Sequence, residues 1–233
     1  MLYNASTREM TLKLVYYGPA LSGKTTNLQI VHRCLQDESR GRLMTLNTAD
    51  DRTLFFDVLP LFFEAKGVKL KIKMFTVPGQ VMHAATRKIV LAGADGVVFV
   101  ADSRLSEARA NVEAWKGLVE NLKNNGVDPD NTPIVIQFNK RDLDNIRSDE
   151  ELEKLAQHSA EPIFKAIALQ NKGVLETLFG LLALSFRHID RNKTFANFDL
   201  DERTFLNKVN AQINGVVTKK VDVDKILEGL VRK

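Results

Sequence analysis

Cysteine is almost absent from this sequence, which contains one, Cys34, among 233 residues. A single cysteine cannot form a disulfide within the chain, so the composition favours a reducing compartment such as the cytosol. Cys34 lies on an expected helix, where a buried small hydrophobic side chain is a better interpretation than a reactive thiol. Long hydrophobic runs are absent too, because the longest, residues 178–186, is too short to span a bilayer and is typical of a buried helix.

An excess of one charge is also missing. The 33 lysines and arginines against 29 aspartates and glutamates give a net charge of +4, spread along the chain. This small excess does not indicate binding to nucleic acid or to a membrane surface. Residues 1–8 are polar with no apolar segment after them, residue 2 is leucine, and the last residues include no cysteine, so we expect neither a signal peptide nor a myristoyl or prenyl anchor. The expected location is the cytoplasm, with no integral membrane segment.

Strand-like and helix-like segments alternate along most of the chain. The strand-like runs are 11–17, 54–63, 69–77, 97–101, 133–138 and 162–168, and the helical patterns are 24–36, 82–92, 106–124, 149–158 and 174–190. This alternation predicts an α/β fold with a six-stranded, mostly parallel sheet and flanking helices. The second and third strands are joined too closely for a crossover, so they should form an antiparallel hairpin at one edge. Ser148 and Glu151 have the spacing of a capping box.

The composition changes near residue 191. We expect residues 1–190 to form the main domain and residues 191–233 a C-terminal helical extension. Phe205, Val209 and Ile213 recur every four residues, and a second apolar face follows at Val223, Ile226, Leu227 and Leu230. Two short amphipathic helices are rarely stable unpacked. The alternatives are that they dock on their own domain, bind a partner, or form a disordered tail.

The most informative motif is a phosphate-binding loop. Residues 18–25 have the pattern Gly-x-x-x-x-Gly-Lys-Thr between a strand-like run and a helical one. In this context successive backbone N–H groups wrap nucleotide phosphates. The lysine would reach the β- and γ-phosphates, with a catalytic role, and the threonine hydroxyl would bind Mg²⁺. The expected phosphate contacts are Gly18, Ala20, Leu21, Ser22, Gly23, Lys24, Thr25 and Thr26.

A second motif indicates which base is bound, since the phosphate loop alone does not separate ATPases, kinases and GTPases. Asn139, Lys140 and Asp142 follow an apolar strand, at the end where ligands bind in open α/β sheets. A carboxylate there accepts hydrogen bonds from guanine N1–H and from the exocyclic amino group. Adenine lacks that pair of donors, and a site built for them rejects it. The motif therefore favours guanine over an adenine-directed enzyme such as a kinase.

Two further segments indicate hydrolysis. In residues 76–80, the Gly79 N–H is placed to touch a γ-phosphate and Gln80 to orient an attacking water. In the polar stretch 50–53, Thr53 would complete the Mg²⁺ shell and Arg52 would neutralise charge on the transferred phosphoryl group. The alternative is a scaffold that binds guanine nucleotide with little hydrolysis, and the presence of Gln80 and Arg52 argues against it.

Together these motifs resemble the Ras-like small GTPases, most closely the MglA family of bacterial cell-polarity GTPases. The resemblance covers roughly residues 8–190, and its most specific stretches are 16–19, 23–28, 51–57, 76–80 and 95–102. It implies a P-loop NTPase with a Ras-like G domain, monomeric, that switches between GTP and GDP with Mg²⁺. It also implies that Arg52 is an arginine finger supplied in cis, that Thr53 contacts Mg²⁺ and that Gln80 positions water.

The resemblance implies partners as well. A homodimeric roadblock-domain protein would accelerate hydrolysis. Motility or polarity effectors would bind the GTP form, and through them the protein would control cell polarity or gliding or pilus motility. Recruitment to a cell pole or the membrane would then run through partners.

The sequence departs from the general Ras pattern at two places. Thr76 stands where most Ras-like proteins have an aspartate near the metal, so Mg²⁺ would either bind more weakly or be held through water by Asp50 or Asp51. The last guanine-contacting motif, usually Ser-Ala-Lys, is Ile-Ala-Leu at residues 167–169. Ala168 and Leu169 are still expected to contact the nucleotide. The N–H of Ala168 would reach the guanine carbonyl, whereas Leu169 lacks the contribution of the usual lysine.

Overall fold

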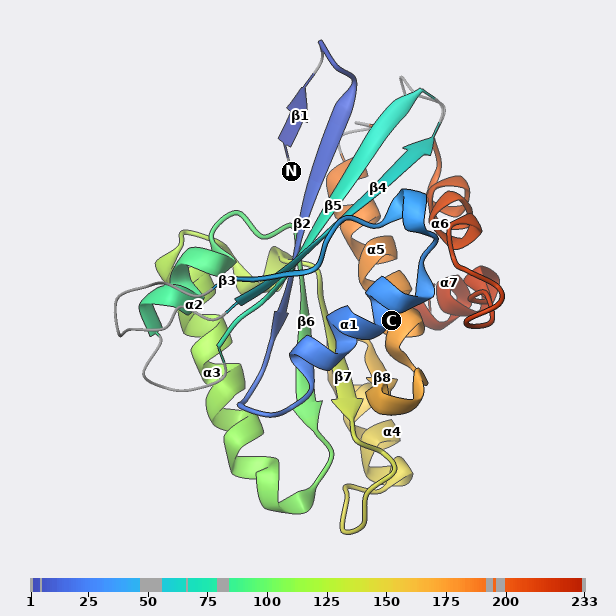
Figure 1. The fold of residues 1–233 in the computed structure, drawn as a ribbon. Coiled ribbons are helices and arrows are strands. Elements are labelled where there is room, and N and C mark those ends of the chain that lie inside the picture. Colours follow the sequence, from blue (N-terminus) through green and yellow to red (C-terminus); the bar gives the residue numbers. More distant parts are fainter. Residues whose placement is uncertain are drawn as a thin grey trace.

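The computed structural model describes residues 2–4, 6–46, 56–65, 67–78, 84–191, 195 and 200–231. The strands are β1 (Leu2–Asn4), β2 (Glu9–Tyr17), β3 (Met44–Leu46), β4 (Phe56–Ala65), β5 (Val68–Thr76), β6 (Gly96–Asp102), β7 (Ile134–Asn139) and β8 (Ile163–Lys165). The helices are α1 (Lys24–Cys34), α2 (Ala84–Leu91), α3 (Ala108–Asn124), α4 (Asp149–His158), α5 (Val174–Asp190), α6 (Glu202–Ala211) and α7 (Val223–Val231). Figure 1 shows them arranged around one twisted sheet.

The sheet confirms the predicted mixed architecture. Its strand order is β3-β4-β5-β2-β6-β7-β8, with β1 paired to β2. Neighbouring strands from β5 to β8 run parallel, whereas β4 is antiparallel to β5 along its length. The six predicted strands are all present, and two three-residue strands, β1 and β3, are added to them. The carboxyl ends of β2, β6 and β7 therefore lie along one edge of the sheet.

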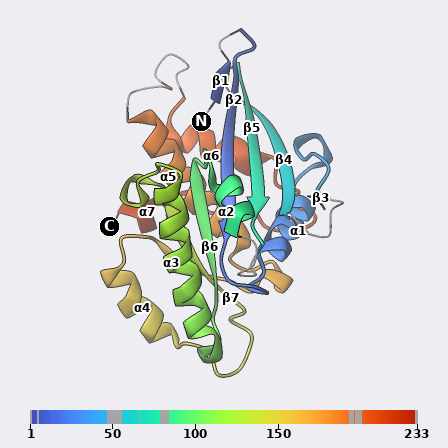
Figure 2. The same ribbon diagram turned by 90° about the vertical axis from the view of Figure 1, so that its left-hand side faces the viewer.

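Helices cover both faces of the sheet, as Figures 1 and 2 show together. On β2 the alternation of side chains divides the core, because Leu14 and Tyr16 face one helical layer and Val15 and Tyr17 face the other. The first layer contains α1, α5, α6 and α7. The second contains α2, α3 and α4. The phosphate loop follows β2, so it starts from a strand that is buried on both sides.

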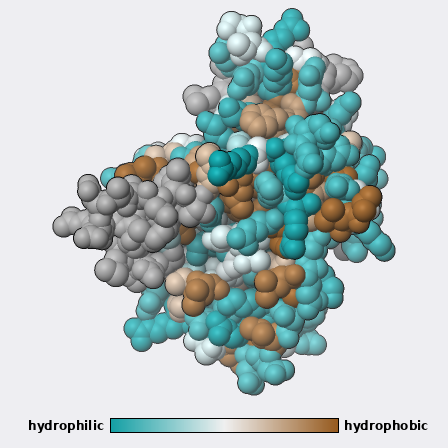
Figure 3. Space-filling view, in the orientation of Figure 1, coloured by the Kyte–Doolittle hydropathy of each residue, from teal (hydrophilic) through white to brown (hydrophobic). Residues whose placement is uncertain are grey.

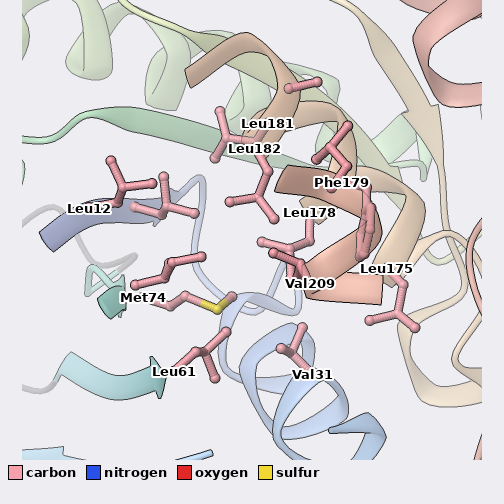
Figure 4. Close-up of a cluster of buried hydrophobic side chains, with 14 of the residues drawn as sticks. Leu12, Val31, Leu61, Met74, Leu175, Leu178, Phe179, Leu181, Leu182 and Val209 are labelled. Carbon is pink, nitrogen blue, oxygen red and sulfur yellow. The ribbon is translucent and has the colours of Figure 1, made fainter. Parts of the chain in front are cut away.

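The C-terminal helices dock on their own domain, which was one of the three alternatives. The ring of Phe186 on α5 stacks against those of Phe195 and Phe205, with centroids 4.4 and 5.3 Å apart. Figure 4 shows Val209 of α6 in the same buried cluster as side chains of α1 and α5. Arg187 Nε also donates to a carboxylate oxygen of Glu202 at 2.6 Å. The extension therefore completes the core beside α5.

The structure differs from the predicted boundaries in two informative places. The first helix was expected to reach residue 36, but α1 ends at Cys34 because Leu35 pairs in a β-bridge with Ile213 of the extension. The last strand was expected over 162–168, but β8 ends at Lys165 and a 3₁₀ turn, η5 (Ala168–Gln170), follows. The predicted capping box is present, since Ser148 and Glu151 bond reciprocally at the start of α4.

Hydrophobic side chains are dispersed on the face shown in Figure 3, where small brown patches lie among hydrophilic residues. None of the described helices combines the length and apolar character that a bilayer crossing requires.

Candidate nucleotide-binding site

The phosphate loop lies where the sequence predicts it, between β2 and α1. Gly18 has φ +144° and Gly23 has φ +103°, a backbone region that favours glycine. A Cβ atom on Gly18 would lie 2.2 Å from the carbonyl oxygen of Val100, and one on Gly23 would lie 2.3 Å from Nδ2 of Asn139. Both glycines are therefore required for the loop to lie against β6 and β7.

Lys24 is folded back on the loop that contains it. Its ammonium donates to the carbonyl oxygens of Gly18 at 3.1 Å and Pro19 at 2.6 Å. The side chain is 7% exposed. Burial lowers the pKa of Lys24 to about 8, and the positive charge of Arg87 makes a smaller contribution in the same direction. The negative charge of Asp57 acts to raise this pKa. A phosphate group arriving in the loop would supply the negative charge that this buried cation lacks.

The base motif and the phosphate loop line one space. A cavity of about 150 Å³ is bounded by nine residues, Leu21, Gly23, Thr26, Asn139, Lys140, Asp142, Leu143, Ala168 and Leu169. Apart from Leu143, all of them were predicted from sequence as nucleotide contacts. Segments more than a hundred residues apart in sequence thus meet around one cavity, with the Asp142 carboxylate among its walls.

Asn139 ties the walls of this cavity together. Its Nδ2 donates to the carbonyl oxygen of Ser22 at 2.9 Å, and its Oδ1 accepts from the N–H of Ala168 at 2.9 Å. The sequence predicts that the N–H of Ala168 donates a hydrogen bond to a guanine carbonyl, and in the structure this N–H donates to Asn139. A base would therefore share the Ala168 N–H with Asn139. Leu169 is 80% exposed at the rim.

Asp102 is a buried carboxylate that the sequence reasoning did not assign. Its Oδ2 accepts from Lys140 Nζ at 2.7 Å and from Arg104 at 2.8 Å. Burial opposes ionisation of Asp102, but hydrogen bonds from Arg104 and Lys140 outweigh it and hold its pKa below the usual value. The pairing orients the Lys140 stem beside the cavity. The sequence did contain a signal for Asp102, because this residue ends a strand. The base motif also begins at a strand end, and in the structure Asp102 lies opposite Asn139 at the ends of β6 and β7.

A second unassigned carboxylate, Asp57, lies beside Thr25, the threonine that the sequence predicts to bind Mg²⁺. Thr25 Oγ1 donates to Asp57 Oδ2 at 2.7 Å, and Thr76 Oγ1 donates to the same oxygen at 3.0 Å. The backbone N–H of Asp57 in turn donates to Thr76 Oγ1 at 2.8 Å. Asp57 is 5% exposed. The sequence assigned the compensating charge to Asp50 or Asp51, which lie outside the described residues, while Asp57 on β4 already contacts Thr25.

This oxygen-rich arrangement fits Mg²⁺. The ion prefers oxygen ligands, keeps several waters, and is held in nucleotide sites by one or two protein groups together with phosphates. Among the described residues no three His, Cys, Asp or Glu side chains gather into a metal site. The Thr25 hydroxyl and the Asp57 carboxylate are the described protein groups placed to hold the ion next to a nucleotide.

A buried amide network supports the start of α1. Asn27 Nδ2 donates to the carbonyl oxygen of Gly23 and to Gln137 Oε1, both at 2.9 Å. Gln137 Nε2 returns bonds to Asn27 and to the Thr177 hydroxyl. Because β7 and α5 carry Gln137 and Thr177, the phosphate loop is fixed to the strand that ends in the base motif.

Four predicted catalytic and switch residues, Arg52, Thr53, Gly79 and Gln80, lie outside the described residues. Their roles stay predictions. The strand that leads toward Gly79 ends beside the phosphate loop, because the N–H of Val77 donates to the carbonyl oxygen of Tyr16 at 3.2 Å.

Comparison with known proteins agrees with this geometry. The chain is 48% identical over 176 residues to the mutual gliding-motility protein MglA of Myxococcus xanthus (strain DK1622), a match that covers 75% of this chain and 90% of that protein. The chain belongs to the MglA family of Ras-like small GTPases. No family model matches the chain. In this MglA-family protein, Thr76 at the end of β5 donates a hydrogen bond to Asp57 on the neighbouring strand β4.

Proposed function

We propose that this small GTPase binds GTP and GDP with Mg²⁺ at the described cavity, hydrolyses GTP slowly, and regulates gliding motility or cell polarity through the difference between its two nucleotide forms. The observation that carries the proposal is the cavity itself, in which Gly23 of the phosphate loop and Asp142 of the base motif line one space. The name of the relative, a mutual gliding-motility protein, supports the biological role.

Base selection rests on Asp142. Its two carboxylate oxygens accept from guanine N1–H and from the exocyclic amino group, whereas adenine presents an acceptor at N1. Asn139 keeps this wall in place through its bonds to Ser22 and Ala168. With adenine in the cavity the Asp142 carboxylate would gain neither of these hydrogen bonds, so ATP should bind weakly.

Phosphate binding rests on the loop and on Lys24. The backbone N–H groups that open α1 point toward the phosphates, and the helix N-terminus favours their charge. Lys24 exchanges its bonds to Gly18 and Pro19 for phosphate oxygens. Mg²⁺, when bound, neutralises charge on the β- and γ-phosphates. Thr25 and Asp57, with Thr53, are the residues proposed to hold it.

Hydrolysis rests on Gln80, which orients the attacking water, and on Arg52, which stabilises the charge that develops on the phosphoryl group. Catalysis of this kind is mostly positioning and electrostatic stabilisation. Intrinsic turnover is slow as long as these groups are not held in place. A homodimeric roadblock-domain partner that arranges them would accelerate hydrolysis by about 10³- to 10⁵-fold, the range for a supplied arginine.

The experiment is single-turnover GTP hydrolysis by the full chain, with and without a homodimeric roadblock-domain protein. Arg52→Ala and Gln80→Leu should each abolish most of the stimulation, while Arg109→Ala, which removes an exposed pair with Glu113 on α3, should leave it unchanged. If both variants keep the stimulated rate, the assignment of catalytic roles is wrong. If GTP stays intact in every arm, the protein is a guanine-nucleotide scaffold.

A further inference from the structure

The loop that forms the far wall of the base cavity is a tight turn. Ile167 and Lys172 pair through two backbone hydrogen bonds of 2.9 and 3.2 Å. Between them the turn η5 presents Ala168 and Leu169 to the cavity. Asn171 closes the turn with φ +56°, and its N–H donates to the carbonyl oxygen of Ala168 at 3.0 Å. We call residues 167–172 the guanine-side loop.

The C-terminal extension bonds directly to this loop. Asn171 Nδ2 donates to Thr218 Oγ1 at 2.9 Å, across 47 residues of sequence. Thr218 belongs to the turn between α6 and α7, where its N–H donates to the carbonyl oxygen of Asn214 at 3.1 Å. Asn214 is itself bonded, through its N–H, to the carbonyl oxygen of Cys34 at the end of α1, at 2.8 Å. The turn is thus held at α1 while Thr218 holds the loop.

The anchor behind Thr218 is firm. The side chains of Phe205, Leu206 and Val209 on α6 are buried in the main core. Asn214 adds a backbone bond to Cys34 at the end of α1. The guanine-side loop is therefore tied to the docked extension through the side chain of Asn171.

We propose that Thr218 is a positioning residue that holds the guanine-side loop against the base and slows release of bound nucleotide. The proposal rests on the proposed function, because it requires guanine nucleotide in this cavity. The cavity is small and the loop is one of its walls, so a bound base leaves more readily when the loop moves outward. Outward movement breaks the bond between Asn171 and Thr218. Leu169 adds no charged contact that would keep the loop closed on its own.

The test is the rate at which fluorescently labelled GDP leaves the full-length protein when unlabelled GDP is added in excess. Thr218→Val keeps the shape of the side chain and removes the acceptor. Loss of one neutral hydrogen bond corresponds to about fivefold faster release. Thr218→Ser keeps the hydroxyl and should release GDP at the wild-type rate. Single-turnover GTP hydrolysis at saturating GTP should be the same in all three proteins, because the loop contacts the base and not the phosphates.

Thr204→Val is the matched control. Thr204 lies in the same extension, and its hydroxyl donates to Asp201 at 2.8 Å at the start of α6, with no bond to the loop. It should leave release unchanged. Equal release by wild type and Thr218→Val overturns the inference, and so does equal acceleration by Thr204→Val, which would indicate general loosening of the extension. Wild-type protein that fails to retain labelled GDP would instead overturn the proposed function.

Discussion

The carboxylate of Asp57 accepts a hydrogen bond from the hydroxyl of Thr25 at 2.7 Å, which joins β4 to the phosphate loop at the expected metal position. The same carboxylate oxygen accepts from Thr76 at 3.0 Å. A residue on the neighbouring antiparallel strand thus supplies the negative charge that Thr76, at the end of β5, does not carry.

Asp57→Asn should weaken Mg²⁺-dependent retention of GDP. The substitution keeps the size of the side chain but removes the charge that would orient metal ligands, and losses of this kind cost about 10- to 100-fold in metal affinity. The measurement is labelled-GDP release as a function of free Mg²⁺, where the half-maximal concentration should rise by that factor. Glu64→Gln, at an exposed position on the same strand, is the control. An unchanged Mg²⁺ requirement in Asp57→Asn would remove Asp57 from the metal site.

Asp142→Asn should lower affinity for GDP by about 100-fold, because one of the two charge-assisted hydrogen bonds is lost and the other no longer involves a charge. The amide has one acceptor and one donor, which suits xanthine, whose second carbonyl replaces the guanine amino group. Competition between GDP and XDP for the labelled site measures the change. Wild-type preference for GDP in the variant would show that Asp142 does not contact the base.

Lys24 gives the nucleotide-free protein a pH-dependent stability. Because burial lowers its pKa from 10.5 to about 8, the unfolded chain binds more protons at this residue than the folded chain between those values. The free energy of unfolding therefore rises with pH across this window, by at most about 1.4 kcal/mol per pH unit. The difference in stability between wild type and Lys24→Met, from denaturant unfolding at pH 7.5 to 9.5, should grow in favour of wild type. A constant difference would contradict the low pKa.

Phe205→Ala should destabilise the whole domain, since this ring is buried against Phe186 in the main core. Truncations of this type cost about 3–5 kcal/mol. Urea unfolding at a fixed nucleotide concentration measures the loss. Val216→Ala, in the same extension but at a side chain that is 96% exposed, should change stability by less than about 0.5 kcal/mol. Similar stability for both variants would mean that the extension is an independent appendage.

The phosphate loop, the base motif and the alternating elements could be predicted because each rests on local spacing. Gly18, Gly23 and Asp142 stand in contiguous motifs, and the capping box of Ser148 and Glu151 is a local pattern as well. Asp57 and Thr218 could not be assigned in this way. Their partners, Thr25 and Asn171, are distant in sequence, and the antiparallel register of β4 and the docking of α6 bring them together.

The same reason explains the boundary errors. The spacing of apolar residues favours a helix through residue 36, but the end of α1 is decided by the bridge between Leu35 and Ile213. There a tertiary contact outweighs a local preference. The contact of the Ala168 N–H with guanine stays a prediction, and in the structure this N–H donates to Asn139 Oδ1.

The most direct test of the central claim is a competition for GTP turnover. The purified protein is loaded with radiolabelled GTP in Mg²⁺ in the presence of excess unlabelled ATP or excess unlabelled GTP, and labelled GDP is followed over time. Slow conversion of GTP to GDP that survives excess ATP but is abolished when excess GTP is present during loading is the predicted result. Displacement of the label by ATP, or GTP that remains unhydrolysed with and without a roadblock-domain partner, would contradict a guanine-specific GTPase.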